Sequence, residues 1–135
     1  MIRLLRGALT VAVELDAQGV PAGYPFQPGW EVSPRAVSAM CQAGDGIVLL
    51  DCRLDKEVAA ASIAGAVHVP MQSIADRLDE LEEHVDDKVV VFCHGGVRSM
   101  RVVAFLRERG FEDVWSMAGG IDLWSLSVDT KVPRY

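Results

Sequence analysis

Short apolar runs recur along the chain from residue 47 onward. Ile47–Leu50 is a continuous apolar run that ends at a polar residue, and Lys88–Phe92 repeats this form and ends at Cys93. Such runs are typical of strands that are covered on both faces of a sheet. A short extended segment is expected around Val67–Val69, and a further strand over Asp113–Met117. The pattern therefore predicts a buried sheet whose strands end in chemically useful side chains.

Segments with helical spacing separate these runs. Ser33 and Pro34 form an N-cap followed by a proline in the first turn, which predicts that a helix begins there. Arg98–Arg109 is expected to form a helix that Gly110 ends. Further helices are expected over Asp55–Ala60, Ser73–His84 and Gly119–Trp124. Strands that alternate with helices in this way predict an α/β fold, with a mostly parallel sheet and helices on both faces.

The first 29 residues follow a different pattern. Residues 18–30 hold three glycines and three prolines, a density that continues neither a helix nor a central strand. Leu9–Leu15 is expected to form an extra edge strand. The chain is therefore divided into residues 1–29, an arm or extra edge strand, and residues 30–135, the main domain.

Size and charge limit the classes of partner. A chain of 135 residues is one domain by default, and its net charge of -6 disfavours nucleic acid and anionic membranes as partners. The first thirteen residues only faintly resemble a signal peptide, because acidic residues stand where the cleavage site should be. The expected location is the cytoplasm. Three cysteines without close pairing argue against a metal site and leave at least one free thiol.

The loop after the second apolar run has the features of an anion cradle. Cys93 stands at a strand end, Gly95 and Gly96 allow a tight turn, and a helix follows. Backbone N–H groups in such a loop converge on an anion, and the helix N-terminus adds unsatisfied donors. The same donors favour a thiolate at Cys93. A lone cysteine is more often a small buried hydrophobe, but the glycines and the following Arg98 and Ser99 favour a nucleophile.

Four segments together resemble the rhodanese family, in that family's order and spacing from about Trp30 to Trp124. They are Leu49-Leu50-Asp51-Cys52-Arg53, Ile63-Ala64-Gly65-Ala66-Val67-His68-Val69-Pro70, Cys93-His94-Gly95-Gly96-Val97-Arg98-Ser99 and Ala118-Gly119-Gly120-Ile121-Asp122-Leu123-Trp124. The resemblance implies a rhodanese-like α/β fold, with a five-stranded, mostly parallel sheet flanked by helices. It also implies a loop cysteine that carries sulfur as a persulfide. No cofactor is expected.

The chain departs from the family pattern at two positions. Ser62 replaces a usual histidine, and Cys52 replaces a usual valine. Because the usual residue is apolar, Cys52 is expected to lie buried beneath the site and not to form a disulfide with Cys93.

Loop length separates two reactions that rhodanese-like folds support. Four residues lie between Cys93 and Arg98, whereas related phosphatases and arsenate reductases have one residue more, which makes room for a tetrahedral oxyanion. The shorter loop favours sulfur transfer over phosphate hydrolysis. The expected mechanism is attack of the Cys93 thiolate on a donor such as thiosulfate, then release of the sulfur to a thiol or cyanide acceptor, with a sulfur-relay protein as an alternative acceptor.

The resemblance also indicates which residues contact the substrate. These are the loop residues after the nucleophile and one arginine, namely His94, Gly95, Gly96, Val97, Arg98, Ser99 and Arg53. Arg98 either holds the anionic end of the donor or caps a surface helix, and His94 either orients substrate or lies idle. Arg53 more often fixes loops together with Asp51 than it touches substrate. The alternative for the whole chain is a non-catalytic rhodanese-like module that binds or regulates a partner.

Overall fold

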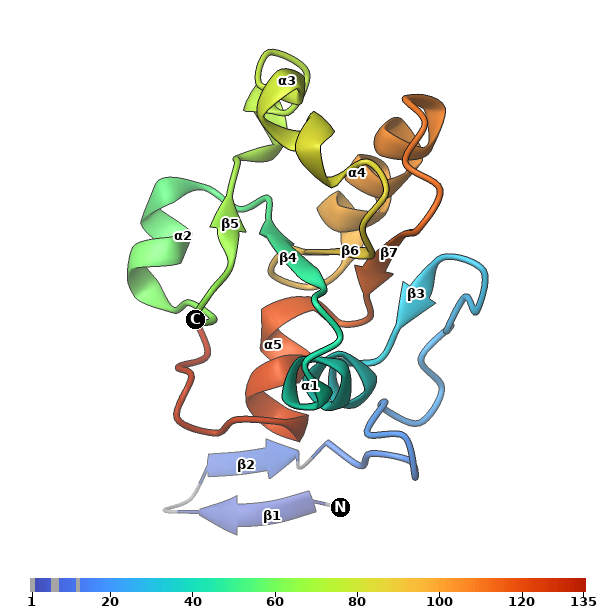
Figure 1. The fold of residues 1–135 in the computed structure, drawn as a ribbon. Helices are drawn as coiled ribbons and strands as arrows, with labels where there is room; N and C mark the ends of the chain where they lie inside the picture. The colour runs from blue at the N-terminus through green and yellow to red at the C-terminus, as the bar shows by residue number, and fades with distance from the viewer. Residues whose placement is uncertain (1, 6–7, 12) are drawn as a thin grey trace.

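A five-stranded sheet forms the centre of the molecule (Figure 1). The computed structural model describes the backbone of residues 2–5, 8–11 and 13–135, and side chains from residue 13 onward. All pairings in this sheet are parallel. In spatial order its strands are β3 (Glu31–Val32), β7 (Val114–Met117), β6 (Val89–Phe92), β4 (Val48–Asp51) and β5 (Val67–His68).

Helices cover both faces of this sheet, as the sequence predicts. They are α1 (Pro34–Ala43), α2 (Asp55–Ala60), α3 (Leu78–Leu81), α4 (Val97–Glu108) and α5 (Gly120–Ser127), with short 3-10 turns η1 (Met71–Ser73) and η2 (Glu82–His84). Figure 1 shows α4 on one face and α1 and α5 on the other. The Ser33 side chain accepts a hydrogen bond from the backbone of Ala36, which confirms the expected cap of α1.

Successive side chains of β6 point to opposite faces of the sheet, and both faces are covered, which explains why its sequence is apolar throughout. Val89 and Val91 belong to the core on the α4 side, which also contains Val102, Val103 and Leu106. Val90 and Phe92 belong to the opposite core, with residues of α1 and α5. A strand buried on both faces needs an apolar side chain at every position.

Strand register brings two loops together at the carboxyl edge of the sheet. Asp51 at the end of β4 pairs with Phe92 at the end of β6. The next residues, Cys52 and Cys93, therefore leave the sheet from neighbouring strands. Ligand sites in parallel α/β sheets lie at this edge.

The prediction of a single helix over Ser73–His84 is wrong. The segment instead contains the single turn η1, the four-residue α3 and the turn η2. Its apolar residues Ile74 and Leu81 are nevertheless buried in the core. Like charges four residues apart destabilise a helix, and this segment has two such pairs: Asp76 with Glu80, and Asp79 with Glu83.

The N-terminal strand also differs from the expectation over Leu9–Leu15. Strand β2 (Ala8–Val11) pairs antiparallel with β1 (Ile2–Leu5) in a separate two-stranded sheet and does not extend the five-stranded one. Residue 12, inside the expected strand, lies outside the described residues. Leu15 instead forms an isolated bridge with Pro21. Within the part of the chain that the structure describes, helices long and apolar enough to cross a bilayer are absent.

Candidate active site

The sulfur of Cys93 is surrounded by hydrogen-bond donors. Cys93 is 1% exposed, and its Sγ accepts hydrogen bonds from the backbone N–H groups of Gly96 (3.1 Å) and Ser99 (3.4 Å). The Ser99 hydroxyl lies 3.4 Å from the same sulfur and 2.8 Å from the hydroxyl of Ser116 on β7. The loop therefore closes on the cysteine as the sequence predicts, and Ser99 ties it to the neighbouring strand.

Gly96 and Gly120 allow the backbone of the active-site loop to lie close to the backbone at the start of α5. Gly96, at the start of α4, has a φ of +103°, and a Cβ there would lie 3.3 Å from the backbone nitrogen of Gly119. A Cβ on Gly120 would collide with the carbonyl oxygens of Cys93 and His94. Those two carbonyls accept hydrogen bonds from the first turn of α5, at 2.9 and 3.1 Å. The N-terminus of α5 thus holds the backbone of the loop.

These contacts make Cys93 an acidic thiol. Its pKa falls to about 5, chiefly through the neighbouring Cys52 thiol and further through Ser99 and Gly96, although burial acts in the opposite direction. The interaction with Cys93 and burial raise the pKa of Cys52 above its ordinary value. At neutral pH Cys93 is therefore a thiolate, which is the nucleophilic form of cysteine.

Cys52 is buried beside the nucleophile, as expected. It is 1% exposed, and its Sγ donates to the carbonyl oxygen of Phe92 at 3.4 Å. A thiol has one hydrogen, so the Phe92 carbonyl and the Cys93 thiolate compete for it. Cys41, Cys52 and Cys93 are all free thiols in the structure.

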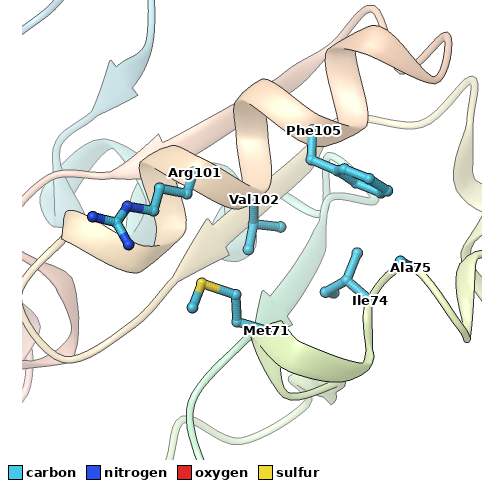
Figure 2. Close-up of a pocket in the computed structure, with 6 residues that line it drawn as sticks. All are labelled: Met71, Ile74, Ala75, Arg101, Val102 and Phe105. Atoms are coloured by element: carbon cyan, nitrogen blue, oxygen red, sulfur yellow. The ribbon is translucent and has the colours of Figure 1, made fainter.

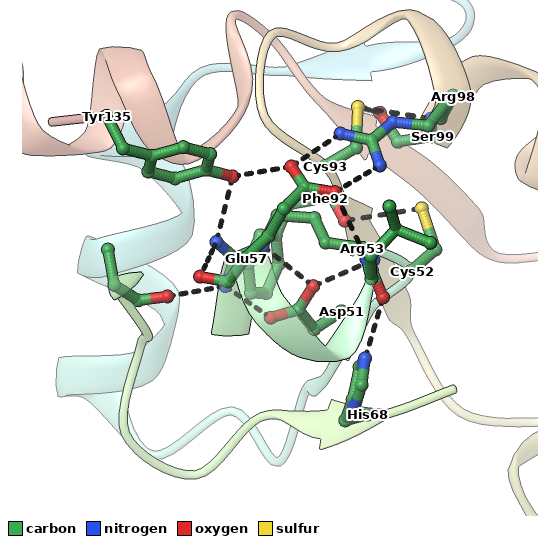
Figure 3. A network of polar contacts seen from close by, with 12 residues as sticks. Asp51, Cys52, Arg53, Glu57, His68, Phe92, Cys93, Arg98, Ser99 and Tyr135 are labelled. Atoms are coloured by element: carbon green, nitrogen blue, oxygen red, sulfur yellow. Dashed lines mark hydrogen bonds and ion pairs between the residues drawn. The ribbon is translucent and has the colours of Figure 1, made fainter. Parts of the chain in front are cut away.

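Arg98 is engaged by a carboxylate that the sequence analysis did not consider. Its guanidinium forms two hydrogen bonds with Glu57 of α2, at 2.6 and 2.9 Å (Figure 3). The paired Arg98 lowers the pKa of Glu57 to about 2. Binding of the donor by Arg98 stays a prediction. Such binding requires the donor to share Arg98 with Glu57 or to displace the Glu57 carboxylate.

Arg53 is fully buried, and its guanidinium is held by other protein groups. It forms a two-point ion pair with Asp51, at 2.9 and 2.7 Å, and also donates to the carbonyl oxygens of Glu57 and Ala61. These bonds join the end of β4 to α2 and the loop after it. The geometry favours the loop-fixing interpretation over contact with substrate.

The outer residues of the loop face solvent to different degrees. Gly95 is exposed, Val97 is 70% exposed, and His94 is half-buried. The His94 ring stacks on the ring of Tyr135, with centroids 4.2 Å apart and planes 17° from parallel. His94 is therefore not idle in solvent, and whether it orients substrate stays a prediction.

Three residues of the site were missed from the sequence: Tyr24, Glu57 and Tyr135. The Tyr24 hydroxyl donates to Glu31 at 2.6 Å and accepts from the backbone of Gly119 at 3.2 Å. Burial and this contact with Glu31 raise its pKa to about 12. Tyr24 and Tyr135 reach the loop from segments outside the family motifs, so no local spacing could have identified them. Glu57 could have been identified only from the tertiary arrangement that brings α2 next to α4.

A small apolar cavity lies between α4 and the segment that begins with η1 (Figure 2). Its volume is about 140 Å³, and it contains no residue of the Cys93–Ser99 loop. Its lining residues are Met71, Ile74, Ala75, Arg101, Val102 and Phe105. Across the described residues, clusters of three or more His, Cys, Asp or Glu suited to a metal ion are absent.

Known proteins resemble this chain in sequence and in fold. The thiosulfate sulfurtransferase GlpE of Haemophilus influenzae is 37% identical over 103 residues, which cover 74% of this chain and 94% of that protein. The tRNA uridine(34) hydroxylase of Acaryochloris marina is 36% identical over 126 residues. This match covers 90% of the chain but 39% of that protein, so the chain spans well under half of that relative.

A crystal structure of a rhodanese-like domain protein from Staphylococcus aureus superposes with a TM-score of 0.67 at 25% identity, covering 78% of this chain and 98% of that one. Residues 33–127 match the family model described as a rhodanese-like domain. This range contains Cys93, its loop, and the strands and helices that position it. The chain therefore belongs to the rhodanese-like sulfurtransferase family.

Proposed function

We propose that this protein is a sulfurtransferase that moves a sulfane sulfur from a donor such as thiosulfate to a nucleophilic acceptor through a persulfide on Cys93. The observation that carries the proposal is the acidic Cys93 thiol, whose sulfur accepts backbone hydrogen bonds from Gly96 and Ser99. The relative GlpE, which this chain covers almost completely, is a thiosulfate sulfurtransferase. Thiosulfate is therefore the first donor to test.

The reaction has two half-reactions. In the first, the Cys93 thiolate attacks the outer sulfur of thiosulfate, the sulfur–sulfur bond of the donor breaks, and sulfite leaves with the electron pair. In the second, a thiolate or cyanide attacks the outer sulfur of the persulfide, and the Cys93 thiolate leaves. Ping-pong kinetics follow from the covalent intermediate.

The loop supplies the electrostatic stabilisation that both half-reactions need. Negative charge lies on sulfur at each stage, and preorganised N–H donors stabilise such charge without having to reorient. The first-turn N–H groups of α4 have no acceptors within the helix. The N–H of Ser99 is one of these groups, and together with that of Gly96 it contacts Sγ. The short loop encloses a sulfur atom more readily than a phosphoryl group.

Intact-mass spectrometry after treatment with thiosulfate tests the proposal directly. We expect a gain of one sulfur atom that maps to Cys93 and disappears on adding cyanide or a thiol. The Cys93→Ser variant should gain no sulfur, because its hydroxyl is not ionised at neutral pH. A protein that stays unmodified with thiosulfate and with an organic persulfide would instead support a binding or regulatory module. Phosphatase activity lost in Cys93→Ser would contradict the loop-length argument.

A further inference from the structure

Tyr135 reaches the active-site loop from a segment beyond the family match. The match ends at residue 127, and the chain then runs from α5 toward α2, where Figure 1 places residue 135. Arg134 holds this segment to α5 through two hydrogen bonds with Asp122, at 2.8 and 3.2 Å. The ring of Tyr135 stacks on His94, the residue directly after the nucleophile.

The Tyr135 hydroxyl contacts two charged side chains, those of Glu57 and Arg53 (Figure 3). It donates to Glu57 Oε2 at 2.8 Å and accepts from the Arg53 guanidinium at 3.0 Å. Glu57 Oε2 also accepts from Arg98 at 2.9 Å. The Tyr135 side chain therefore spans the distance from His94 to the Glu57–Arg98 pair, along the α2 side of the loop.

This position matters because Cys93 is 1% exposed. A donor or acceptor must approach its sulfur past the side chains that surround the loop, and His94, Glu57 and Arg98 are among them. Tyr135 is itself 43% exposed. The stack on His94, a hydrogen bond to Glu57 and a hydrogen bond from the buried Arg53 hold it, and such contacts are individually weak. The ring therefore lies beside side chains that flank the active-site loop, and these few contacts, rather than burial in the core, hold it there.

We infer that Tyr135 is a specificity-determining residue, whose ring limits the size of the molecules that reach Cys93 between His94 and Glu57. Small reactants such as thiosulfate and cyanide pass with the ring in place, whereas bulky thiols and their persulfides require the ring to swing away. The choice of substrates rests on the proposed function. The size limit itself is a property of access to the thiolate and does not depend on sulfur transfer.

Alkylation with two reagents that share one reactive group measures this limit. In both iodoacetamide and its bulky fluorescein derivative, the Cys93 thiolate displaces iodide. The rates at Cys93 are read by peptide mass spectrometry in the wild type, Tyr135→Phe and Tyr135→Ala. We expect the small-to-bulky rate ratio to fall about tenfold in Tyr135→Ala, the scale of a lost aromatic pair. It should stay near the wild-type value in Tyr135→Phe, which keeps the ring.

Two controls keep the test decisive. Cys41, which is exposed, reports the intrinsic ratio in the same sample, and the buried Cys52 stays unlabelled as long as the fold is intact. If Tyr135→Ala exposes Cys52, the Arg134→Ala variant replaces it, because loss of the pair with Asp122 frees the same segment from the surface. An unchanged ratio at Cys93 in the folded variant would overturn the inference. A change of equal size in Tyr135→Phe would overturn it as well, since the hydroxyl and not the ring would then be responsible.

The two proposals fail separately. If thiosulfate leaves no sulfur on Cys93 while the alkylation ratio responds to Tyr135, only the proposed sulfur transfer is lost. If the persulfide forms and the ratio does not respond, only the role of Tyr135 is lost.

Discussion

Cys93 carries its negative charge where water scarcely reaches it. Burial alone would raise the pKa of a thiol. Here the donors around the sulfur outweigh burial, so that the pKa falls to about 5. The largest single influence is another thiol, Cys52, at a position where the family usually has valine.

The pH dependence of alkylation should report this low pKa. The rate of Cys93 labelling by iodoacetamide is expected to rise with pH through a midpoint of about 5, because the thiolate fraction rises there. Partial burial raises the pKa of Cys41 above its ordinary 9.0, so its rate should rise only in alkaline solution. Peptide-resolved rates between pH 4 and 10 supply both curves in one experiment. A Cys93 midpoint near that of Cys41 would contradict the proposed thiolate.

Replacing Cys52 by valine should move that midpoint upward. Valine is similar in size and apolar, but it cannot donate to the thiolate. We expect the Cys93 labelling curve of Cys52→Val to shift toward higher pH while the melting temperature changes little. If the Cys52 hydrogen remains with the Phe92 carbonyl, its present acceptor at 3.4 Å, the curve would not move.

Local sequence was sufficient to identify the nucleophile and its loop. Cys93 follows a buried strand and precedes glycines and a helix, and these features depend only on neighbouring residues. The partner of Arg98 could not be predicted in this way, because Glu57 lies 41 residues earlier in the chain. Its position also has a local explanation, since its carboxylate accepts from the Leu54 backbone at the start of α2.

At the scale of elements, α2 and α4 meet through the Glu57–Arg98 ion pair. Exposed fractions of 12% for Glu57 and 28% for Arg98 place it in partial contact with solvent. The pair neutralises the one arginine of the active-site loop. Binding of an anionic donor at Arg98 must therefore compete with Glu57.

The Glu57→Gln variant should accordingly bind thiosulfate more tightly. We expect its KM for thiosulfate to fall by up to about fivefold, the scale of a partly exposed ion pair. Arg98→Ala should raise the KM, since binding common to ground and transition states is lost. Steady-state kinetics with cyanide as the acceptor measure both values. An unchanged KM in both variants would restrict Arg98 to a structural role.

The contact between α5 and the loop predicts an unequal effect of two glycine substitutions. Gly44 and Gly120 both have positive φ, but a Cβ on Gly44 meets nothing within 4 Å, whereas one on Gly120 collides with the loop carbonyls. Gly44→Ala should therefore lower the free energy of unfolding by about 1 kcal/mol through backbone strain alone. Gly120→Ala should cost at least about 2 kcal/mol more. Chemical denaturation of the two variants gives the difference, and equal losses would show that the loop relaxes without cost.

At the scale of the whole molecule, the fold was predictable wherever the chain repeats a regular pattern. Strands β4, β6 and β7 are four-residue, mostly apolar and largely buried segments, so their composition identifies them. Strand β3 has only two residues, too few for a recognisable period. The contacts of Tyr24 and Tyr135 depend on where the arm and the final segment cross the surface. Long-range packing decides that, and no local spacing records it.

The residues that make Cys93 acidic come from several parts of the chain, so its charge is a product of folding. In the unfolded chain the thiol has its ordinary pKa of 9.0, whereas in the folded chain the value is about 5. Folding between these pH values therefore releases a proton. Because the folded pKa is depressed, this stabilisation is fully present above pH 9 and is lost as the pH falls through about 5.

Across that window the free energy of unfolding should rise by up to about 1.4 kcal/mol per pH unit from this group. Cys52 has the opposite effect, since its raised pKa keeps it protonated in the folded state while the unfolded thiol ionises above pH 9. These two thiols together favour greatest stability near pH 9, and the pH dependence of the urea midpoint in the wild type and in Cys93→Ser measures their share. Reactivity and stability are thus linked in this protein, because unfolding returns the Cys93 thiol to its ordinary pKa.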